Sequence, residues 1–172
     1  MSELARKTRD EFLQSEKKQV VVVLDNVRSG LNVGSIFRTA DAFAIEKIVL
    51  CGITPKPPHR EILKTALGAT DTVSWEYQEH CKTAVEDLLD SGYTVLPVEQ
   101  TDESQMLDSI NWYQVGPVAL VFGNEVNGVS DEVIGMLSSS VEIPQFGTKH
   151  SLNVAVSVGI VLWHIVYEIG QL

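Results

Sequence analysis

The sequence has few cysteines, no long uninterrupted apolar run and a shortage of positive charge. Its 172 residues include two cysteines, Cys51 and Cys81, which lack the CxxC spacing typical of metal or redox motifs. No apolar secretory segment stands near the N-terminus, so the cytoplasm is the expected compartment. Residues 151–169 are mostly apolar, but polar side chains interrupt them, and the charge-free part falls short of the ~18 residues that a membrane span needs. We therefore expect no membrane insertion.

Acidic residues outnumber basic ones. The chain holds 13 Lys and Arg against 23 Asp and Glu, which gives a formal net charge of −10. Broad binding to nucleic acid needs a basic surface, so this composition argues against it, and no DNA partner is expected. A local cationic site on an acidic body is still compatible with the charge. The four histidines show no metal-ligand spacing, so we expect no metal.

Apolar strands and amphipathic helices alternate along the chain. With 44% hydrophobic residues, a chain of this size forms a single domain with a substantial core. The alternation predicts an α/β fold with a mostly parallel sheet and helices on both faces, in which ligands bind beyond the carboxyl ends of the strands. We expect a helical extension over residues 1–18 and a catalytic core over residues 19–172. The predicted strands are Val20–Asp25, Lys47–Cys51, Thr72–Trp75, Thr94–Val98, Val118–Phe122 and Ser140–Ile143, and the predicted helices are Leu4–Gln14, Val33–Ala44, Ile62–Leu67, Cys81–Asp90, Asp131–Ser138 and Ser151–Ile169.

The first segment of chemical interest, residues 26–38, is a polar turn between a strand and a helix. Apolar residues recur at helical spacing after the turn, and Arg38 lies in the early turns of that helix. A helix N-terminus with a guanidinium nearby is suited to binding an anion. A structural alternative also fits: Asn32 caps the helix, and Arg38 pairs with Asp41.

The second segment, residues 118–129, is an apolar strand followed by a polar loop between glycines. Gly123 and Gly128 let the backbone approach a ligand closely or adopt a positive φ. The loop is not the GxGxxG fingerprint of dinucleotide-binding folds, and the chain has no Walker loop, so a generic nucleotide-dependent enzyme is disfavoured. Glu125 is either a solvated loop residue or a functional carboxylate at the end of the strand.

The third segment, residues 143–156, again joins a strand to a helix through a loop that contains proline and glycine. Ser151 is a strong N-cap candidate for the long apolar helix that follows. This role does not account for Asn153, which we expect to be a buried amide near the start of that helix. A buried amide needs hydrogen-bond partners, and a polar ligand or a facing loop can supply them.

Taken together, the three segments resemble the SpoU/TrmH branch of the SPOUT superfamily of RNA 2′-O-methyltransferases. The resemblance runs from about Val20 to the C-terminus, and residues 64–69 also look like a loop of this family. Each motif is weak alone, but three in the right order and spacing are specific. The matching residues are Asn32 and Arg38 in the first segment, Gly123, Glu125 and Gly128 in the second, and Ser151, Leu152 and Asn153 in the third.

The resemblance implies a deep trefoil knot in the C-terminal part of the fold, S-adenosylmethionine as cofactor, and a homodimer in which residues of both subunits approach each site. True knots are nearly absent among folds, and periodicity alone gives no sign of one. The knot loops would bind the cofactor mainly through backbone groups. The cofactor-binding residues implied are Val98, Gln100, Gly123, Ile143, Gly147, Ser151 and Leu152.

The reaction implied is methyl transfer to a ribose 2′-hydroxyl of tRNA or rRNA. Arg38 matches the family's catalytic arginine, but a guanidinium with a pKa above about 12 is a poor base. We therefore expect Arg38 to hold the phosphate and ribose, while a water, a phosphate oxygen or Glu125 accepts the proton. Glu125 can otherwise orient Arg38. The catalytic set is Arg38, Asn32, Glu125, Ser151 and Asn153, and the expected RNA contacts are Arg28, Arg60, Lys64, Lys149 and His150.

Two alternatives accompany this hypothesis. The chain can be an RNA- or cofactor-binding module of the same fold that has lost turnover, although the catalytic set is intact. The basic residues of the N-terminal segment can extend the RNA footprint, but interleaved acidic residues favour a solvated helix.

Overall fold

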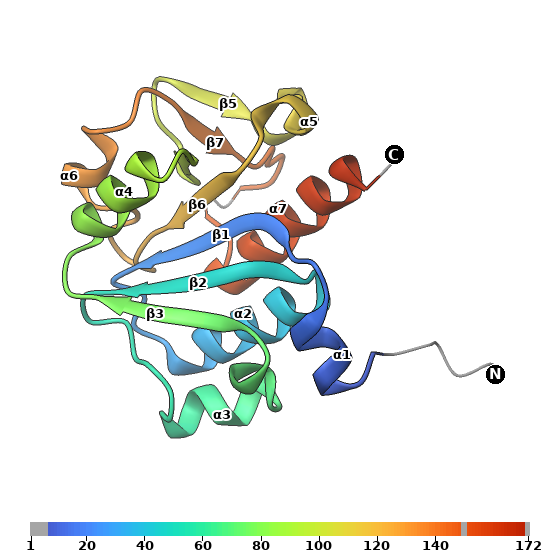
Figure 1. Cartoon of the computed structure of the whole chain (residues 1–172). Coiled ribbons are helices and arrows are strands. Elements are labelled where there is room, and N and C mark those ends of the chain that lie inside the picture. The colour runs from blue at the N-terminus through green and yellow to red at the C-terminus, as the bar shows by residue number, and fades with distance from the viewer. Residues whose placement is uncertain (1–6, 149–150, 171–172) are drawn as a thin grey trace.

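The computed structural model describes residues 7–148 and 151–170 (Figure 1). Five parallel strands form the main sheet in the order β3-β2-β1-β6-β4. This confirms the predicted α/β fold with a parallel sheet, whereas the knot stays a prediction. The strands of this sheet are β1 (Lys18–Asp25), β2 (Ile45–Cys51), β3 (Ser74–Gln78), β4 (Thr94–Pro97) and β6 (Val118–Phe122).

The two central strands, β1 and β6, consist largely of buried valine and leucine. β-branched side chains suit a pleated surface that is covered on both faces. Val22 lies in register between Ile48 of β2 and Leu120 of β6, and Leu24 pairs with Phe122. The two central strands therefore end at the same edge of the sheet, and the turns that follow them meet there.

Helices cover both faces of the sheet, as predicted (Figure 1). They are α2 (Gly30–Ala42), α3 (Arg60–Ala66), α4 (Cys81–Asp90), α6 (Asp131–Ile134) and α7 (Val154–Ile169). Val22 and Leu24 of β1 share one core with buried residues of α2, α3 and α7. Val21 and Val23, which point to the opposite face, share a second core with α4 and α6.

A small second sheet extends the edge beyond β4. It pairs β5 (Ser104–Met106) with β7 (Ser140–Glu142) in parallel, and a bridge between Val98 and Val141 connects it to the end of β4. β7 matches a predicted strand, but β5 and the short helix α5 (Trp112–Val115) were not predicted. Two 3₁₀ turns, η1 (Ala69–Asp71) and η2 (Leu107–Ser109), complete the fold with α1 (Arg9–Gln14).

Two helix starts correct the sequence-based expectations. Ser29, not Asn32, is the N-cap of α2: its hydroxyl accepts the Asn32 N–H at 3.2 Å. Asn153, not Ser151, is the N-cap of α7, because its side-chain oxygen accepts the N–H groups of Ala155 and Val156. Asn153 is also exposed rather than buried, since capping places its amide at the helix end.

Other boundaries shift by a few residues. α6 ends at Ile134, four residues before the predicted Ser138, and β3 begins at Ser74 because the preceding residues belong to the turn after η1. No helix in the described part of the chain has the length and apolar character needed to span a membrane.

Candidate functional site

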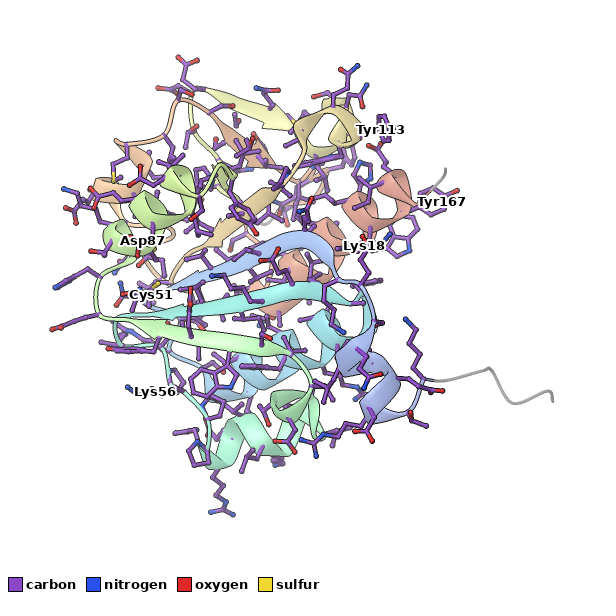
Figure 2. The ribbon with its side chains drawn as sticks, viewed as in Figure 1. Lys18, Cys51, Lys56, Asp87, Tyr113 and Tyr167 are labelled. Atoms are coloured by element: carbon purple, nitrogen blue, oxygen red, sulfur yellow. The ribbon has the colours of Figure 1, made fainter. Side chains whose placement is uncertain are left out.

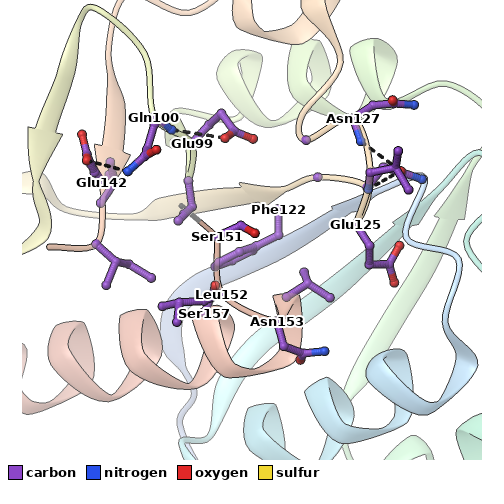
Figure 3. A pocket seen from close by; sticks show the side chains of 18 of the residues that line it. Glu99, Gln100, Phe122, Glu125, Asn127, Glu142, Ser151, Leu152, Asn153 and Ser157 are labelled. Carbon is purple, nitrogen blue, oxygen red and sulfur yellow. Dashed lines mark hydrogen bonds between the residues drawn. The ribbon is translucent and has the colours of Figure 1, made fainter. Parts of the chain in front are cut away.

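A pocket of about 570 Å³ lies where the carboxyl ends of β4, β6 and β7 meet the start of α7 (Figure 3). This is the edge at which ligands bind in parallel α/β sheets. Gly147, predicted to bind cofactor, lies outside the lining and is exposed. The other predicted cofactor residues all line the pocket: Val98, Gln100, Gly123, Ile143, Ser151 and Leu152.

The loop between β6 and α6, residues 123–130, has a fixed backbone. Asn124 and Gly128 exchange two backbone hydrogen bonds of 2.9 Å, and the buried Asn124 amide donates to the Asn26 carbonyl at 2.7 Å. A Cβ on Gly123 would stand 2.0 Å from backbone atoms of Gly128 and Val129, and Gly128 itself has a φ of +70°. Only glycine fits these two positions, and both residues line the pocket.

Glu125 joins the first and second sequence segments. Its carboxylate accepts the backbone N–H groups of Arg28 at 3.1 Å and Ser29 at 3.2 Å, and the side-chain amide of Asn32 at 3.2 Å. These donors stand at the N-terminus of α2, where a negative charge is stabilised. The carboxylate therefore fixes the turn before α2 against the pocket loop.

Asn153 brings in the third segment. Its Nδ2 donates to Oδ1 of Asn32 at 3.2 Å, so Asn32 is hydrogen-bonded both to Glu125 and to the cap of α7. The expected partner of the Asn153 amide is therefore Asn32, in the first turn of α2. Three segments that are far apart in sequence thus share one chain of hydrogen bonds, which we name the Asn32–Glu125–Asn153 network.

The hydrogen bonds around Glu125 change the pKa of its carboxyl group. Partial burial raises the pKa of this carboxyl, but the N–H groups of Arg28, Ser29 and Glu125 itself, together with Asn32, outweigh that effect and lower it below 4.5. A carboxylate with a lowered pKa is a weak base. The geometry therefore favours Glu125 as a positioning residue over Glu125 as proton acceptor.

Residues 19–163 match the model of the SpoU rRNA Methylase family. The chain belongs to this family. The family predicted from the three segments is thereby confirmed.

Individual relatives agree with the family. A tRNA (guanosine(18)-2′-O)-methyltransferase of Aquifex aeolicus is 29% identical over 159 residues, which cover 89% of this chain and 71% of that protein. An AdoMet-bound rRNA methyltransferase from Sinorhizobium meliloti superposes with a TM-score of 0.80 and 29% identity, covering 95% of this chain and 60% of that one. The A. aeolicus TrmH/SpoU tRNA modifying enzyme gives a TM-score of 0.83 at 24% identity, covering 95% and 81% of the two chains. These relatives are longer than this SpoU-family chain.

Arg38, the arginine of the first SpoU motif, lies apart from the pocket lining. It is exposed on α2, six residues and therefore about 9 Å along the helix axis beyond Asn32. Within the described residues, Arg38 makes no hydrogen bond or ion pair. In particular, it is not paired with Glu125 or Asp41. Asp41 instead accepts the hydroxyl of Thr72. The guanidinium is therefore available to a ligand that reaches this surface.

The predicted RNA contacts fall in two places. Arg28 is exposed next to the Asn32–Glu125–Asn153 network, which holds its backbone N–H. Arg60 and Lys64 are exposed on α3 and do not line the pocket. Lys149 and His150 lie outside the described residues.

Two acidic residues at or beside the site were not singled out from the sequence, although Glu99 lies between Val98 and Gln100, which were expected to border the cofactor. Asp25, buried at the end of β1, accepts the Ser130 N–H at 2.9 Å and the Asn26 side chain at 2.7 Å. Glu99 accepts the Val129 N–H at 3.2 Å and lines the pocket. Each ends an apolar strand, which was a usable signal, because polar residues at strand ends lie at the ligand-binding edge.

Proposed function

We propose that this chain transfers a methyl group from S-adenosylmethionine to a ribose 2′-hydroxyl in tRNA or rRNA. One observation carries the proposal: the second and third motifs of the family line a single pocket, and the Asn32–Glu125–Asn153 network ties the first motif to both of them. The names of the Aquifex and Sinorhizobium relatives support the same reaction class.

The pocket fits the proposed cofactor. Its volume is in the range of small-molecule sites, and the 123–130 loop, which Gly123 and Gly128 allow to pack closely, forms one wall of it. Val98, Gln100, Gly123, Ile143, Ser151 and Leu152 would hold the cofactor, whereas Gly147 is left out of this set. When bound, S-adenosylmethionine supplies a methyl group on a positively charged sulfur.

Catalysis by this chain rests on positioning. Holding a hydroxyl in line with a methyl donor removes much of the entropic barrier of a two-molecule reaction. Asn32 and Asn153 fix the loops on either side of the pocket, and Ser151 borders it. Arg38 stays charged and binds the phosphate and ribose of the target nucleotide. The proton passes to water or to a phosphate oxygen, because the Glu125 carboxylate already accepts three hydrogen bonds and its pKa is lowered.

A second copy of the chain would cover the outer face of α7. Val156, Ile160, Trp163 and Tyr167 recur there at helical spacing, and each is more than a third exposed. The rings of Trp163 and Tyr167 stack with centroids 5.3 Å apart, and Tyr113 of α5 lies on the same side of the molecule (Figure 2). A contiguous apolar face of this kind marks an interface, and we propose a homodimer.

Dimer formation would also affect the role of Arg38, which lies outside the pocket of its own protomer. We propose that it acts on the pocket of its partner. Mixing inactive Arg38→Ala and Glu125→Ala proteins then restores about one quarter of wild-type activity, because half of random pairs are mixed and each mixed pair has one complete site. No restoration, with exchange of subunits demonstrated, would place Arg38 at its own pocket.

The activity is tested by incubating the protein with labelled S-adenosylmethionine and total RNA, then digesting the RNA to nucleosides. We expect label on ribose 2′-oxygens, loss of transfer in Arg38→Ala, and unchanged cofactor affinity in that variant. Cofactor binding without methylation of any RNA would instead identify a binding module that has lost turnover. The cytoplasm, where tRNA and rRNA function, is the proposed location.

A further inference from the structure

Glu99 stands where four elements around the pocket meet. It follows β4, and the backbone N–H of the preceding Val98 donates to Val121 of β6 at 2.8 Å. Its own N–H donates to Val141 of β7 at 3.0 Å. Its side chain reaches the 123–130 loop, where Oε2 accepts the Val129 N–H at 3.2 Å. The backbone of Glu99 is thus held between two strands while its carboxylate braces the loop. Figure 3 shows Glu99 at the pocket wall, with its carboxylate bonded to Gln100.

The loop is shaped around this carboxylate. A Cβ on Gly128 would stand 2.3 Å from Oε2 of Glu99, so glycine at this position makes room for the acid. The other oxygen, Oε1, accepts the N–H of Gln100 at 3.2 Å. The carboxylate is therefore held in one orientation at the pocket wall by two backbone donors.

We propose that Glu99 is a specificity-determining residue that favours the positively charged methyl donor over the neutral product. The inference rests on the proposed function, because it concerns the same pocket. Methyl transfer removes the sulfonium charge and leaves a thioether, so the donor and the product differ by one methyl group and one positive charge. A fixed carboxylate in a partly desolvated pocket attracts the cation more strongly than the neutral product. The preference assists exchange of spent product for fresh donor.

Calorimetric titration with three ligands tests this role. They are S-adenosylmethionine, S-adenosylhomocysteine and sinefungin, an analogue whose amine supplies a positive charge in place of the sulfonium. In Glu99→Gln, we expect about tenfold weaker binding of the two charged ligands and at most about a twofold change for S-adenosylhomocysteine. Glu99→Asp keeps the charge with a shorter reach, and should recover part of the preference. Glu132→Gln, which removes an equal charge from the exposed pair with Lys82, is the matched control and should change nothing.

The outcomes distinguish a role of Glu99 in ligand specificity from a purely structural role, and both from failure of the proposed function. Equal weakening of all three ligands in Glu99→Gln, with an unchanged melting temperature, would make Glu99 a brace of the loop and overturn its role in specificity. Unchanged binding of all three would overturn both roles. Failure of the wild-type chain to bind any of the three ligands would count against the proposed function instead.

Discussion

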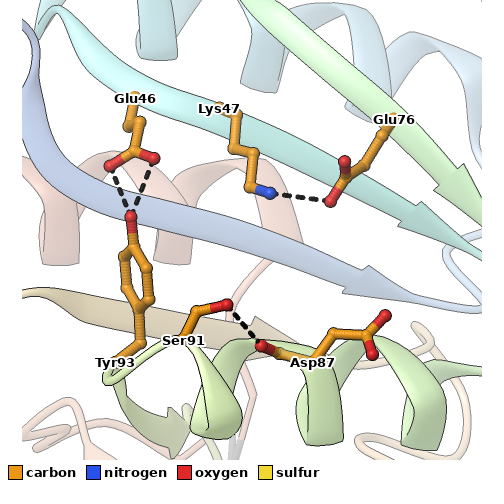
Figure 4. Close-up of polar contacts among 6 residues, drawn as sticks. All are labelled: Glu46, Lys47, Glu76, Asp87, Ser91 and Tyr93. Carbon is orange, nitrogen blue, oxygen red and sulfur yellow. Dashed lines mark hydrogen bonds and ion pairs between the residues drawn. The ribbon is translucent and has the colours of Figure 1, made fainter.

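Two pockets in the described part of the chain differ in how their polar groups are arranged. The first, at the carboxyl ends of the strands, is built from loops in which Glu125 and Glu99 accept backbone N–H groups of other segments. It also holds one side-chain pair, Gln100 with Glu142 at 2.8 Å (Figure 3). The second, of about 270 Å³, lies between α4 and strands β2 and β3. There Tyr93 donates to Glu46 at 2.7 Å, and Lys47 pairs with Glu76 at 2.8 Å (Figure 4).

This difference distinguishes a ligand-binding site from a surface hollow whose side chains are already paired with one another. In the second pocket the side chains satisfy one another, so a ligand would have to replace interactions that already exist. In the first, carboxylates and amides fix the backbone, and Gly123 and Gly128 let the loop pack closely along the pocket wall. Substitutions in the first pocket should therefore change binding and turnover, whereas those in the second should change stability only.

The largest effect is expected at Gly123. A methyl group there meets backbone atoms at 2.0 Å, so Gly123→Ala must displace the loop. We expect cofactor affinity to fall by about 100-fold or more, measured by calorimetry. Gly147→Ala is the matched control, because its Cβ meets no atom within 4 Å. Equal cofactor affinities of the two variants would contradict the role of the 123–130 loop in binding the cofactor.

The second largest effect is expected for Glu125→Gln. The amide keeps one acceptor oxygen but places an NH₂ group against the donors at the start of α2, so the turn before α2 loses its anchor. We expect kcat to fall about 10- to 100-fold, while the cofactor Kd changes less than about threefold. Tyr93→Phe in the second pocket serves as the control and should leave kcat unchanged. If Glu125 were the proton acceptor, the pH dependence of the residual rate would change as well.

The second pocket should respond to alkali. Burial, and then the hydrogen bond and negative charge of Glu46, raise the pKa of Tyr93 to about 12, above its ordinary value of 10. The folded state thus binds the phenolic proton more tightly, so its stabilising contribution is complete below pH 10 and is lost as the pH rises to about 12. The loss should be about 1 kcal/mol, because the ring is partly exposed. The urea midpoint of the wild-type protein should fall between pH 9 and 12, and this fall should be smaller in Tyr93→Phe by the contribution of Tyr93.

The smallest effect is expected for Lys47→Ala. The Lys47–Glu76 pair is partly exposed, and pairs of this kind contribute about 0.2–1 kcal/mol. The free energy of unfolding should fall within that range, with less difference at high salt, and methyl transfer should be unaffected. A loss of activity would show that the second pocket takes part in function.

The central strands could be predicted from the sequence because their valine runs are typical of buried parallel strands. Val118–Phe122 was predicted at its observed bounds, whereas three-residue β5 has no periodicity to detect. Helix caps were harder, since Ser29 and Asn32 are both good caps and only the backbone conformation selects between them.

The site was predicted residue by residue but not as a network. Asn32, Glu125 and Asn153 were candidates from the family motifs, yet their contacts span up to 121 residues of sequence and depend on how the strand ends align. Glu99 and Asp25 were not singled out, because their contacts are with backbone donors on other segments and only their place at strand ends could have pointed to them.

Nucleoside analysis of RNA treated with this protein and a donor carrying a CD₃ group tests the central claim most directly. The account predicts a deuterated methyl group on a ribose 2′-oxygen, absent when Arg38 is replaced by alanine. A deuterated methyl group found only on bases would contradict it.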